Sequence, residues 1–350
     1  MAGSLIVLFF IFLLIAVFTY TNGLHDVSNI IATMISSGAM SARRALLIAV
    51  VFELIGPLAG GTVVASTIAS LVKVEKITAA FGNERMLIVV GAAIAAAITW
   101  NLITWHRGMP SSSSHALVGG LVGAALCATG SFGSVRWGIA DLHSFELRGF
   151  AGIIAALLLS PFLGFAGGYV MCRVVRYLLR WASPRANLFL KRSQVLTAAA
   201  FAFTHGANTA QKSMGIMVMV MVATGRLGEF GVPFWIKLIC AVALSLGALS
   251  GGWRIMKTVG RGIFHLRPEH GFEAQFTSAT IILGNSLVGG PVSTTHITSS
   301  SIMGIGTAFR KKAVRWKKVE EILLSWIVTL PASFILGAFF CSIPIILSKI

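Results

Sequence analysis

The sequence predicts an all-α membrane protein that crosses the bilayer several times. Of its 350 residues, 56% are hydrophobic and only 11% are charged. A soluble domain has roughly 25% charged residues, so a water-soluble enzyme is excluded. A bilayer span needs about 20 consecutive apolar residues, and such stretches recur along the whole chain. The Lys and Arg residues, which give a net charge of +17, fall mainly between these stretches.

The same composition excludes several other classes of protein. Intrinsic disorder is incompatible with so many apolar residues. No soluble segment is long enough to be a DNA-binding domain, so we expect no nucleic-acid partner despite the positive charge. The four cysteines are scattered without a CxxC spacing, which gives no metal or redox motif. The N-terminal apolar segment has no Lys or Arg before Arg43, unlike a secretory signal, and is predicted to be a retained span.

Ten apolar segments are candidate spans. Two of them, 4–40 and 194–224, are too long for one plain helix. Each contains a polar, Gly-containing interruption, so we expect a broken helix or two shorter segments there. The other candidates are 45–70, 86–105, 110–130, 149–171, 233–252, 273–290, 291–308 and 320–347.

Basic residues predict the orientation, because cytoplasmic loops carry an excess of Lys and Arg. With the N-terminus outside, most of the basic residues lie inside. We therefore predict a plasma-membrane protein with its N-terminus outside. The inner basic residues are Arg43, Arg44 and Arg107, together with those in the segments 173–192, 253–272 and 310–318.

The chain repeats two motifs in its two halves. GLHDVSN at 23–29 corresponds to GANTAQK at 206–212, which pairs Asp26 with Thr209. PSSSSH at 110–115 corresponds to PVSTTH at 291–296, which pairs His115 with His296. The two motifs are displaced along the chain by nearly the same distance, which indicates a duplication. We predict a first repeat over 1–172, a basic cytoplasmic loop over 173–192 and a second repeat over 193–350.

Five crossings per repeat, an odd number, would insert the second copy upside down relative to the first. Inverted repeats are typical of secondary transporters, with the substrate between the repeats near the midplane. A duplicated channel or membrane enzyme could share this topology, so the function must be inferred from the residues of the motifs.

Each Pro-Ser/Thr-His segment is predicted to begin a helix, since Pro favours the first turn and Ser or Thr favours the N-cap. Free N–H groups at a helix N-terminus bind anions, and neighbouring hydroxyls would complete an oxyanion site. The alternative is that these hydroxyls bond to their own helix or between helices. Two copies at matched positions favour the anion site.

Asp26 lies within an apolar segment, where a carboxylate is costly and usually marks an ion or proton site. A salt bridge to Lys212, also within an apolar run, is its structural alternative. Glu53 is a second acid of this kind, for which a helix–helix hydrogen bond is the alternative.

Buried histidines add possible proton relays. His25, beside Asp26, is the better candidate, while His115 and His296 could equally make a structural hydrogen bond repeated by duplication. His205 lies at membrane depth as well. No HExxH, GxSxG or P-loop pattern is present, so we expect no enzyme activity.

Together these motifs make the sequence resemble the inorganic phosphate transporter (PiT) family, and within it the bacterial low-affinity Pit-type permeases. The resemblance covers essentially the whole chain. It rests on Gly23, His25, Asp26 and Asn29, on NLITWHRGMPSSSSHALVGG (101–120), THGANTAQKSMG (204–215), GGPVSTTH (289–296) and WIVTLP (326–331).

The resemblance implies phosphate symport driven by protons or sodium, an inverted-repeat fold and a homodimer. His25 and Lys212 are similar to the proton-coupled branch, which carries neutral metal–phosphate complexes. Thr209 stands where the family usually has Asp, which affects the coupling stoichiometry. A related branch carries sulfate.

We therefore predict a phosphate importer with no cofactor and no resident metal. The co-transported ion is H+ or Na+, and a divalent metal could accompany phosphate. A sulfate permease and an uncoupled anion channel are the alternatives. Phosphate is expected at Ser112, Ser113, Ser114, Asn208, Gln211, Ser293, Thr294 and Thr295. The coupling ion is expected at His25, Asp26, Asn29, Glu53 and Thr209, with Lys212 as charge partner and His115, His205 and His296 as relay or structural residues.

Overall fold

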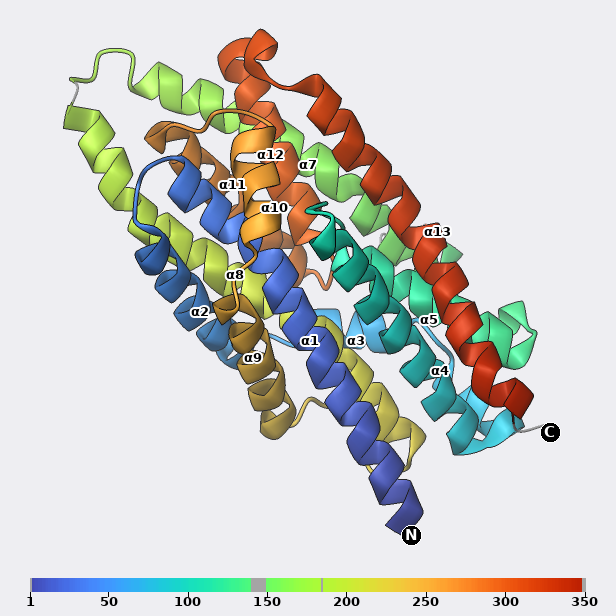
Figure 1. Cartoon of the computed structure of the whole chain (residues 1–350). Helices are drawn as coiled ribbons and strands as arrows, with labels where there is room; N and C mark the ends of the chain where they lie inside the picture. The colour runs from blue at the N-terminus through green and yellow to red at the C-terminus, as the bar shows by residue number, and fades with distance from the viewer. Residues whose placement is uncertain (1, 140–148, 184, 348–350) are drawn as a thin grey trace.

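The computed structural model describes residues 2–139, 149–183 and 185–347, and within these ranges the protein contains helices and no β-strand (Figure 1). The predicted all-α class is confirmed. The first half contains α1 (Ala2–Ser36), α2 (Ala42–Ala59), α3 (Val63–Ala69), α4 (Val74–His106), α5 (Ser113–Thr129) and α7 (Gly149–Leu178). The second contains α8 (Arg185–Ala223), α9 (Phe234–Leu249), α10 (Trp253–Lys257), α11 (Pro268–Leu287), α12 (Thr294–Arg310) and α13 (Trp316–Leu347). Short turns of helix lie at Phe132–Ser134, Thr258–Gly262 and Lys311–Ala313.

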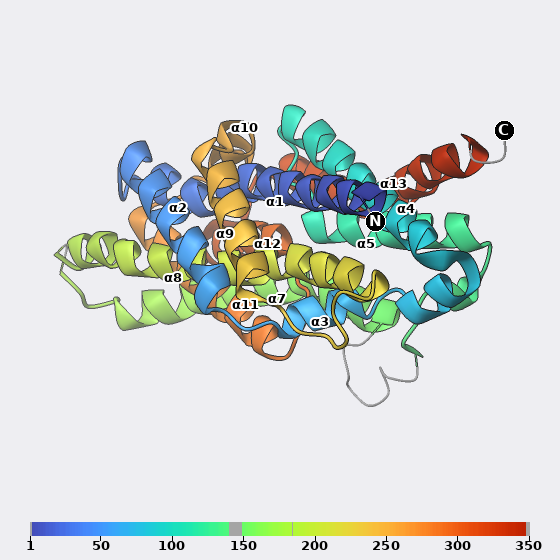
Figure 2. The same cartoon turned by 90° about the horizontal axis from the view of Figure 1, so that it is seen from below.

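The chain is a polytopic membrane protein. Among the described residues, four helices (α1, α4, α7 and α13) are long and apolar enough to cross a bilayer, and up to six spans result if each bent helix pair counts as one. Large apolar side chains such as Phe9, Phe10 and Leu13 are exposed on α1, as expected where a helix faces lipid. Figure 2 shows α1, α5, α7 and α8 lying roughly along one common direction.

Helix breaks occur, but not where the sequence suggested. α1 and α8 are continuous, at 35 and 39 residues, so the prediction of interruptions within 4–40 and 194–224 was wrong. Sharp bends lie instead between α2 and α3, at 76°, and between α9 and the helix over Trp253–Gly262, at 60°, and α4 is kinked at Gly82.

The motif glycines serve close helix packing rather than flexibility. Any side chain at Gly23 of α1 would collide with the carbonyl oxygen of Leu244 on α9. Gly206 of α8 similarly lies against the backbone of Glu53 on α2. The two helix pairs α1–α9 and α2–α8 are thus held in backbone contact, and a helix keeps its regular form around such a glycine because its neighbour fills the space.

The candidate spans at 110–130 and 291–308 are shorter than a full crossing. α5 and α12 have 17 residues each, or about 26 Å at 1.5 Å per residue, against a hydrocarbon core of about 30 Å. Each is capped at its N-terminus by a buried Ser, Ser112 or Ser293, and packs against the helix before it.

The two halves of the chain exchange these short helices. α5 packs against α13 of the second half, and α12 packs against α7 of the first half. Backbone contacts seal both pairs: Gly119 and Gly123 of α5 lie against the carbonyls of Leu330 and Phe334, and Gly304 of α12 lies against that of Phe165. Each helical hairpin, α4–α5 in the first half and α11–α12 in the second, is thus completed by a helix of the other half.

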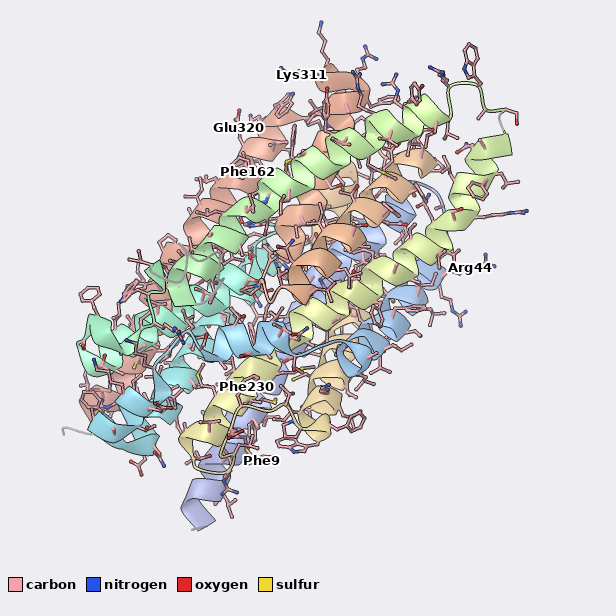
Figure 3. All side chains as sticks on the ribbon, turned by 180° about the vertical axis from the view of Figure 1, so that it is seen from behind. Phe9, Arg44, Phe162, Phe230, Lys311 and Glu320 are labelled. Atoms are coloured by element: carbon pink, nitrogen blue, oxygen red, sulfur yellow. The ribbon has the colours of Figure 1, made fainter. Side chains whose placement is uncertain are left out.

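The ends of the molecule differ in charge. The α1–α2, α7–α8 and α12–α13 connections lie at the end opposite the start of α1 (Figure 1). Figure 3 shows Lys311 and Arg44 toward this end and Phe9 and Phe230 toward the other. We call them the basic end and the N-terminal end. The predicted basic loop at 173–192 is largely helical, because α7 extends to Leu178 and α8 starts at Arg185.

Candidate functional site

The candidate site forms where the C-terminal third of α1 meets the first turns of α5 and α12. Asp26 of α1 is fully buried there. Its Oδ2 accepts a hydrogen bond from Ser113 Oγ at 3.1 Å, and its Oδ1 accepts one from Thr295 Oγ1, also at 3.1 Å. One carboxylate therefore joins the two hydroxyl motifs that the sequence singled out.

Histidines and a second carboxylate extend from Asp26 across three helices. His25 Nδ1 lies 3.1 Å from Asp26 Oδ1. His205 Nε2 of α8 lies 4.0 Å from Asp26 Oδ2, and its Nδ1 lies 2.8 Å from Glu53 Oε1 of α2. All four side chains are buried. The arrangement can hold or move a proton between neighbouring groups, because each acid has a basic neighbour.

The other ring nitrogen of His25 faces two hydroxyls that we did not predict as site residues. His25 Nε2 is 3.3 Å from Ser111 Oγ and 3.4 Å from Thr104 Oγ1. Ser111 in turn donates to Thr104 at 2.8 Å. Both residues belong to the motif at 101–120, and the signal for them was their place in that motif beside Ser112.

The predicted helix starts are confirmed. Ser112 Oγ accepts the N–H of His115, and Ser293 Oγ accepts the N–H of His296, each at 3.2 Å. Ser114 Oγ donates to the carbonyl of Val292 at 3.1 Å. This bond joins the N-terminal tip of α5 directly to the N-terminal tip of α12. Thr294, the first residue of α12, is buried beside these groups. Two helix N-termini with their hydroxyls thus converge inside the molecule.

Three amides predicted at the site have protein partners. Asn29 Nδ2 donates to Thr295 Oγ1 at 3.0 Å, in contact with the Asp26 cluster. Asn208 Nδ2 donates to Ser286 Oγ of α11 at 2.8 Å. Gln211 Oε1 accepts the N–H groups of Val64 and Ala65, so this side chain caps α3. The sequence offered no local signal for that cap, because α3 lies far from Gln211 in the chain.

Lys212 and Thr209 of α8 are fully buried. The Lys212 ammonium has no hydrogen-bond partner among the described residues, and neither has the Thr209 hydroxyl. Lys212 interacts electrostatically with Asp26 and with His115. Lys212 therefore lies near Asp26 and His115 but makes no hydrogen bond to Asp26, so the salt bridge that was the structural alternative is not formed.

A ring stack connects the tips to α13. The rings of His115 and His296 are 4.8 Å apart between centroids. Trp326 stacks on His296 at 4.0 Å, and its Nε1 donates to the carbonyl of Pro110 at 2.8 Å. Trp326 of α13 thus contacts the start of α12 through His296 and the turn before α5 through Pro110. The sequence did not reveal this positioning role.

Taken together, the site offers hydroxyls, helix N–H groups and one ammonium to an oxyanion, beside a buried carboxylate that suits a cation or proton. Among the described residues, no group of three or more His, Cys, Asp or Glu is arranged to hold a metal ion.

A sequence profile described as the phosphate transporter family matches residues 22–188 and 180–337. The chain belongs to the phosphate transporter family. It is 40% identical, over 92% of both chains, to a "Probable low-affinity inorganic phosphate transporter" of Bacillus subtilis. A protein of the same description from Rhizobium meliloti is 38% identical over 92% of this chain and 91% of its own.

Other similarities reach beyond bacteria. A "Putative phosphate permease" of Thermococcus kodakarensis is 28% identical over 91% of this chain and 92% of its own. A solved structure described as "The sodium-dependent phosphate transporter" superposes with a TM-score of 0.86, covering 97% of this chain and 99% of that one, at 24% sequence identity. This structure establishes a shared fold. The phosphate transporter family is a family of membrane carriers, consistent with a protein that is not an enzyme.

Proposed function

We propose that this protein is a secondary active symporter that imports inorganic phosphate together with protons or sodium ions. The observation that carries the proposal is the buried Asp26 carboxylate, which is hydrogen-bonded to Ser113 and to Thr295. It lies between two helix N-termini suited to an oxyanion, so the anion and the coupling ion would bind side by side.

Phosphate would bind between the tips of α5 and α12. The donors would be the hydroxyls of both motifs with the first N–H groups of each helix. Asn208, Gln211 and Lys212 would add donors and charge from α8. A buried ammonium without a hydrogen-bond partner is costly, and an anion beside Lys212 would offset that cost. The proposed hydroxyls belong to Ser112, Ser113, Ser114, Ser293, Thr294 and Thr295.

Coupling would follow from the charge of Asp26. Two like charges a few ångströms apart repel strongly in a protein interior, so an ionised Asp26 opposes phosphate until a cation or a proton compensates it. Binding of each partner would then favour binding of the other. His25, Asn29, Glu53 and Thr209 would complete the coupling-ion site, and His205 links Asp26 to Glu53.

The direction and setting of transport belong to the same proposal. The basic end would face the cytoplasm by the positive-inside rule, which places the N-terminus outside and the protein in the plasma membrane. Residues 1–172 and 193–350 would act as inverted repeats that rock about the site between them. A homodimer is expected from the family resemblance.

Uptake of labelled phosphate into proteoliposomes tests the proposal, with proton and sodium gradients imposed separately. Wild-type protein should concentrate phosphate under at least one gradient. Asp26→Asn, which keeps the shape and removes the charge, should abolish that accumulation. Glu320→Gln makes the same chemical change at an exposed carboxylate (Figure 3) and should leave accumulation intact.

Each other outcome identifies an alternative. Full accumulation by Asp26→Asn would refute the coupling role of Asp26. Uptake that follows only the phosphate gradient, after both ion gradients are collapsed, would indicate an uncoupled channel. Stronger inhibition by sulfate than by arsenate would indicate a sulfate permease. Dependence of phosphate uptake on added Mg2+ would indicate a metal–phosphate complex as the substrate.

A further inference from the structure

A buried amide network closes the basic end of the molecule. Gln275 of α11 donates through Nε2 to Gln194 Oε1 of α8, and also to Thr33 Oγ1 of α1, both at 3.2 Å. Thr197 Oγ1 donates to Gln275 Oε1 at 2.6 Å, and Ser37 Oγ donates to Gln194 Oε1 at 3.0 Å. All five side chains are buried. The network ties α1, α8 and α11 together between the candidate site and the basic end.

Polar side chains continue from this network to Asp26. Thr295 donates to Asp26 and accepts from Asn29. One helical turn toward the basic end, Thr33 follows Asn29 on α1 and Ser299 follows Thr295 on α12, since residues four apart share a helix face. Ser299 is fully buried, and its hydroxyl has no hydrogen-bond partner among the described residues. A line of hydroxyls and amides therefore connects the site with the amide network.

The other end of the molecule lacks this line. In the repeat alignment that pairs Asp26 of α1 with Thr209 of α8, Gln194 corresponds to Ile11 and Thr33 to Ile216. In the alignment that pairs the hairpin residues His115 and His296, Gln275 corresponds to Ile94 and Ser299 to Val118. Four polar residues near the basic end thus have four β-branched apolar counterparts near the N-terminal end.

This difference argues against a purely structural role for the network. The apolar copy shows that the predicted repeat packs without polar groups at these positions. A buried polar network stabilises a protein only where its groups are hydrogen-bonded, and the Ser299 hydroxyl has no such partner among the described residues. Polar groups at one end only are, however, what an ion with its hydration water would need along its path.

The N-terminal end also contains a cavity beside one of these counterparts. A cavity of about 970 Å³ lies there between α1, α4 and α13. Its lining includes Leu8, Ile11, Gly91, Ala92 and Arg226. Ile11, the counterpart of Gln194, therefore borders a cavity, whereas Gln194 itself lies in a closed hydrogen-bonded network.

From these observations we propose that Gln194 and Gln275 form the inner gate of the carrier, and that phosphate leaves the site past Ser299 and Thr33. Opening would separate α11 from α1 and α8 and exchange the amide hydrogen bonds for bonds to water. The inference rests on the proposed function, because an exit route presupposes a transported ion.

Cysteine accessibility tests the gate without relying on transport. The four native cysteines are free thiols and would be replaced by alanine. Ser299→Cys then reports on the exit route, and Val118→Cys is its matched reporter in the other half. A membrane-impermeant maleimide is applied to the basic-end face of reconstituted protein, whose orientation is established by labelling an exposed-loop cysteine.

Gln275→Leu should raise the labelling rate of Ser299→Cys about tenfold or more, because it removes three hydrogen bonds of the closed gate. It should leave the labelling rate of Val118→Cys unchanged. Thr197→Val removes a single bond to Gln275 and should give a smaller increase in the same direction, which keeps the test usable if Gln275→Leu folds poorly. Ile94→Leu, at the counterpart of Gln275, is the control and should change neither rate.

An unchanged rate for Ser299→Cys in both gate variants would overturn the gate, as would an equal rise at both reporters. Failure of the proposed function gives a different result, since wild-type protein would then not accumulate phosphate whatever the labelling shows.

Discussion

Asp26 and Thr295 are joined by a 3.1 Å hydrogen bond across 269 residues of sequence. Ser113 donates to the other oxygen of the same carboxylate. A residue in the first half of the chain is therefore held by the first turn of a helix in each half, and any motion that separates α5 from α12 must break at least one of these bonds.

Removal of either hydrogen-bond donor to Asp26, Ser113 or Thr295, should destabilise the contact between α1, α5 and α12. Hydrogen bonds to a charged group contribute about 1.5–3 kcal/mol, so Ser113→Ala and Thr295→Val should each lower the free energy of unfolding by about that amount. Because both act on one carboxylate, the double variant should deviate from the sum of the single effects. Thermal unfolding of the four proteins in detergent gives the double-mutant cycle, and strict additivity would contradict the shared role.

Helix–helix contact at Gly23 and Gly206 should tolerate no side chain. Gly23→Ala and Gly206→Ala each force backbones apart, and overpacking of this kind costs about 1–3 kcal/mol. Gly284→Ala on α11 is the control, because a methyl group there meets open space, and the change should stabilise by about 0.5–1 kcal/mol through helix propensity. The melting temperatures of the three variants test this prediction. Equal shifts in all three would be inconsistent with close packing at Gly23 and Gly206.

Replacing Lys212 by Met separates its two possible roles. As an ammonium without a hydrogen-bond partner among the described residues, Lys212 is expected to destabilise the phosphate-free protein and to attract the anion. Lys212→Met should therefore raise the melting temperature without phosphate and reduce the further rise on adding phosphate. A lower melting temperature without phosphate would instead mean that Lys212 chiefly neutralises Asp26. Lys212→Arg, which keeps the charge, should retain part of the phosphate effect.

Trp326 should matter both as a ring and as a donor. Trp326→Phe keeps an aromatic ring beside His296 but loses the bond to Pro110, at a cost of about 1 kcal/mol. Trp326→Leu loses the stacking as well and should unfold at a lower temperature than the Phe variant. The control is Trp316→Phe, since Trp316 also donates to a carbonyl, that of Lys311, but is exposed. A shift for the control as large as that for Trp326→Phe would argue against the positioning role.

Sequence reasoning succeeded where the cause is local. Ser112 and Ser293 were expected as N-caps because hydroxyl, proline and apolar run stand next to each other, and both accept the expected N–H. Asp26 was expected to be important because a carboxylate in an apolar segment is costly. Its position between the two tips agrees with that reasoning, although the role of each site residue is still a prediction.

Sequence reasoning failed where the local structure depends on contact with a helix that is distant in the sequence. Gly23 and Gly206 suggested breaks, but α9 and α2 fill the space beside them and keep α1 and α8 continuous. The contact of His205 with Glu53 and the cap that Gln211 provides for α3 join segments that no local pattern connects.

The exchange of short helices between the halves has a consequence for biogenesis. α5 is completed by α13, the last described helix to leave the ribosome, so the glycine face of α5 stays uncovered while the whole second half is translated and inserted. Chains that stop before α13 would display that face to lipid or to quality-control proteases instead of forming a smaller carrier. Two separately encoded halves, by contrast, could restore each other's missing contacts when produced in the same cell.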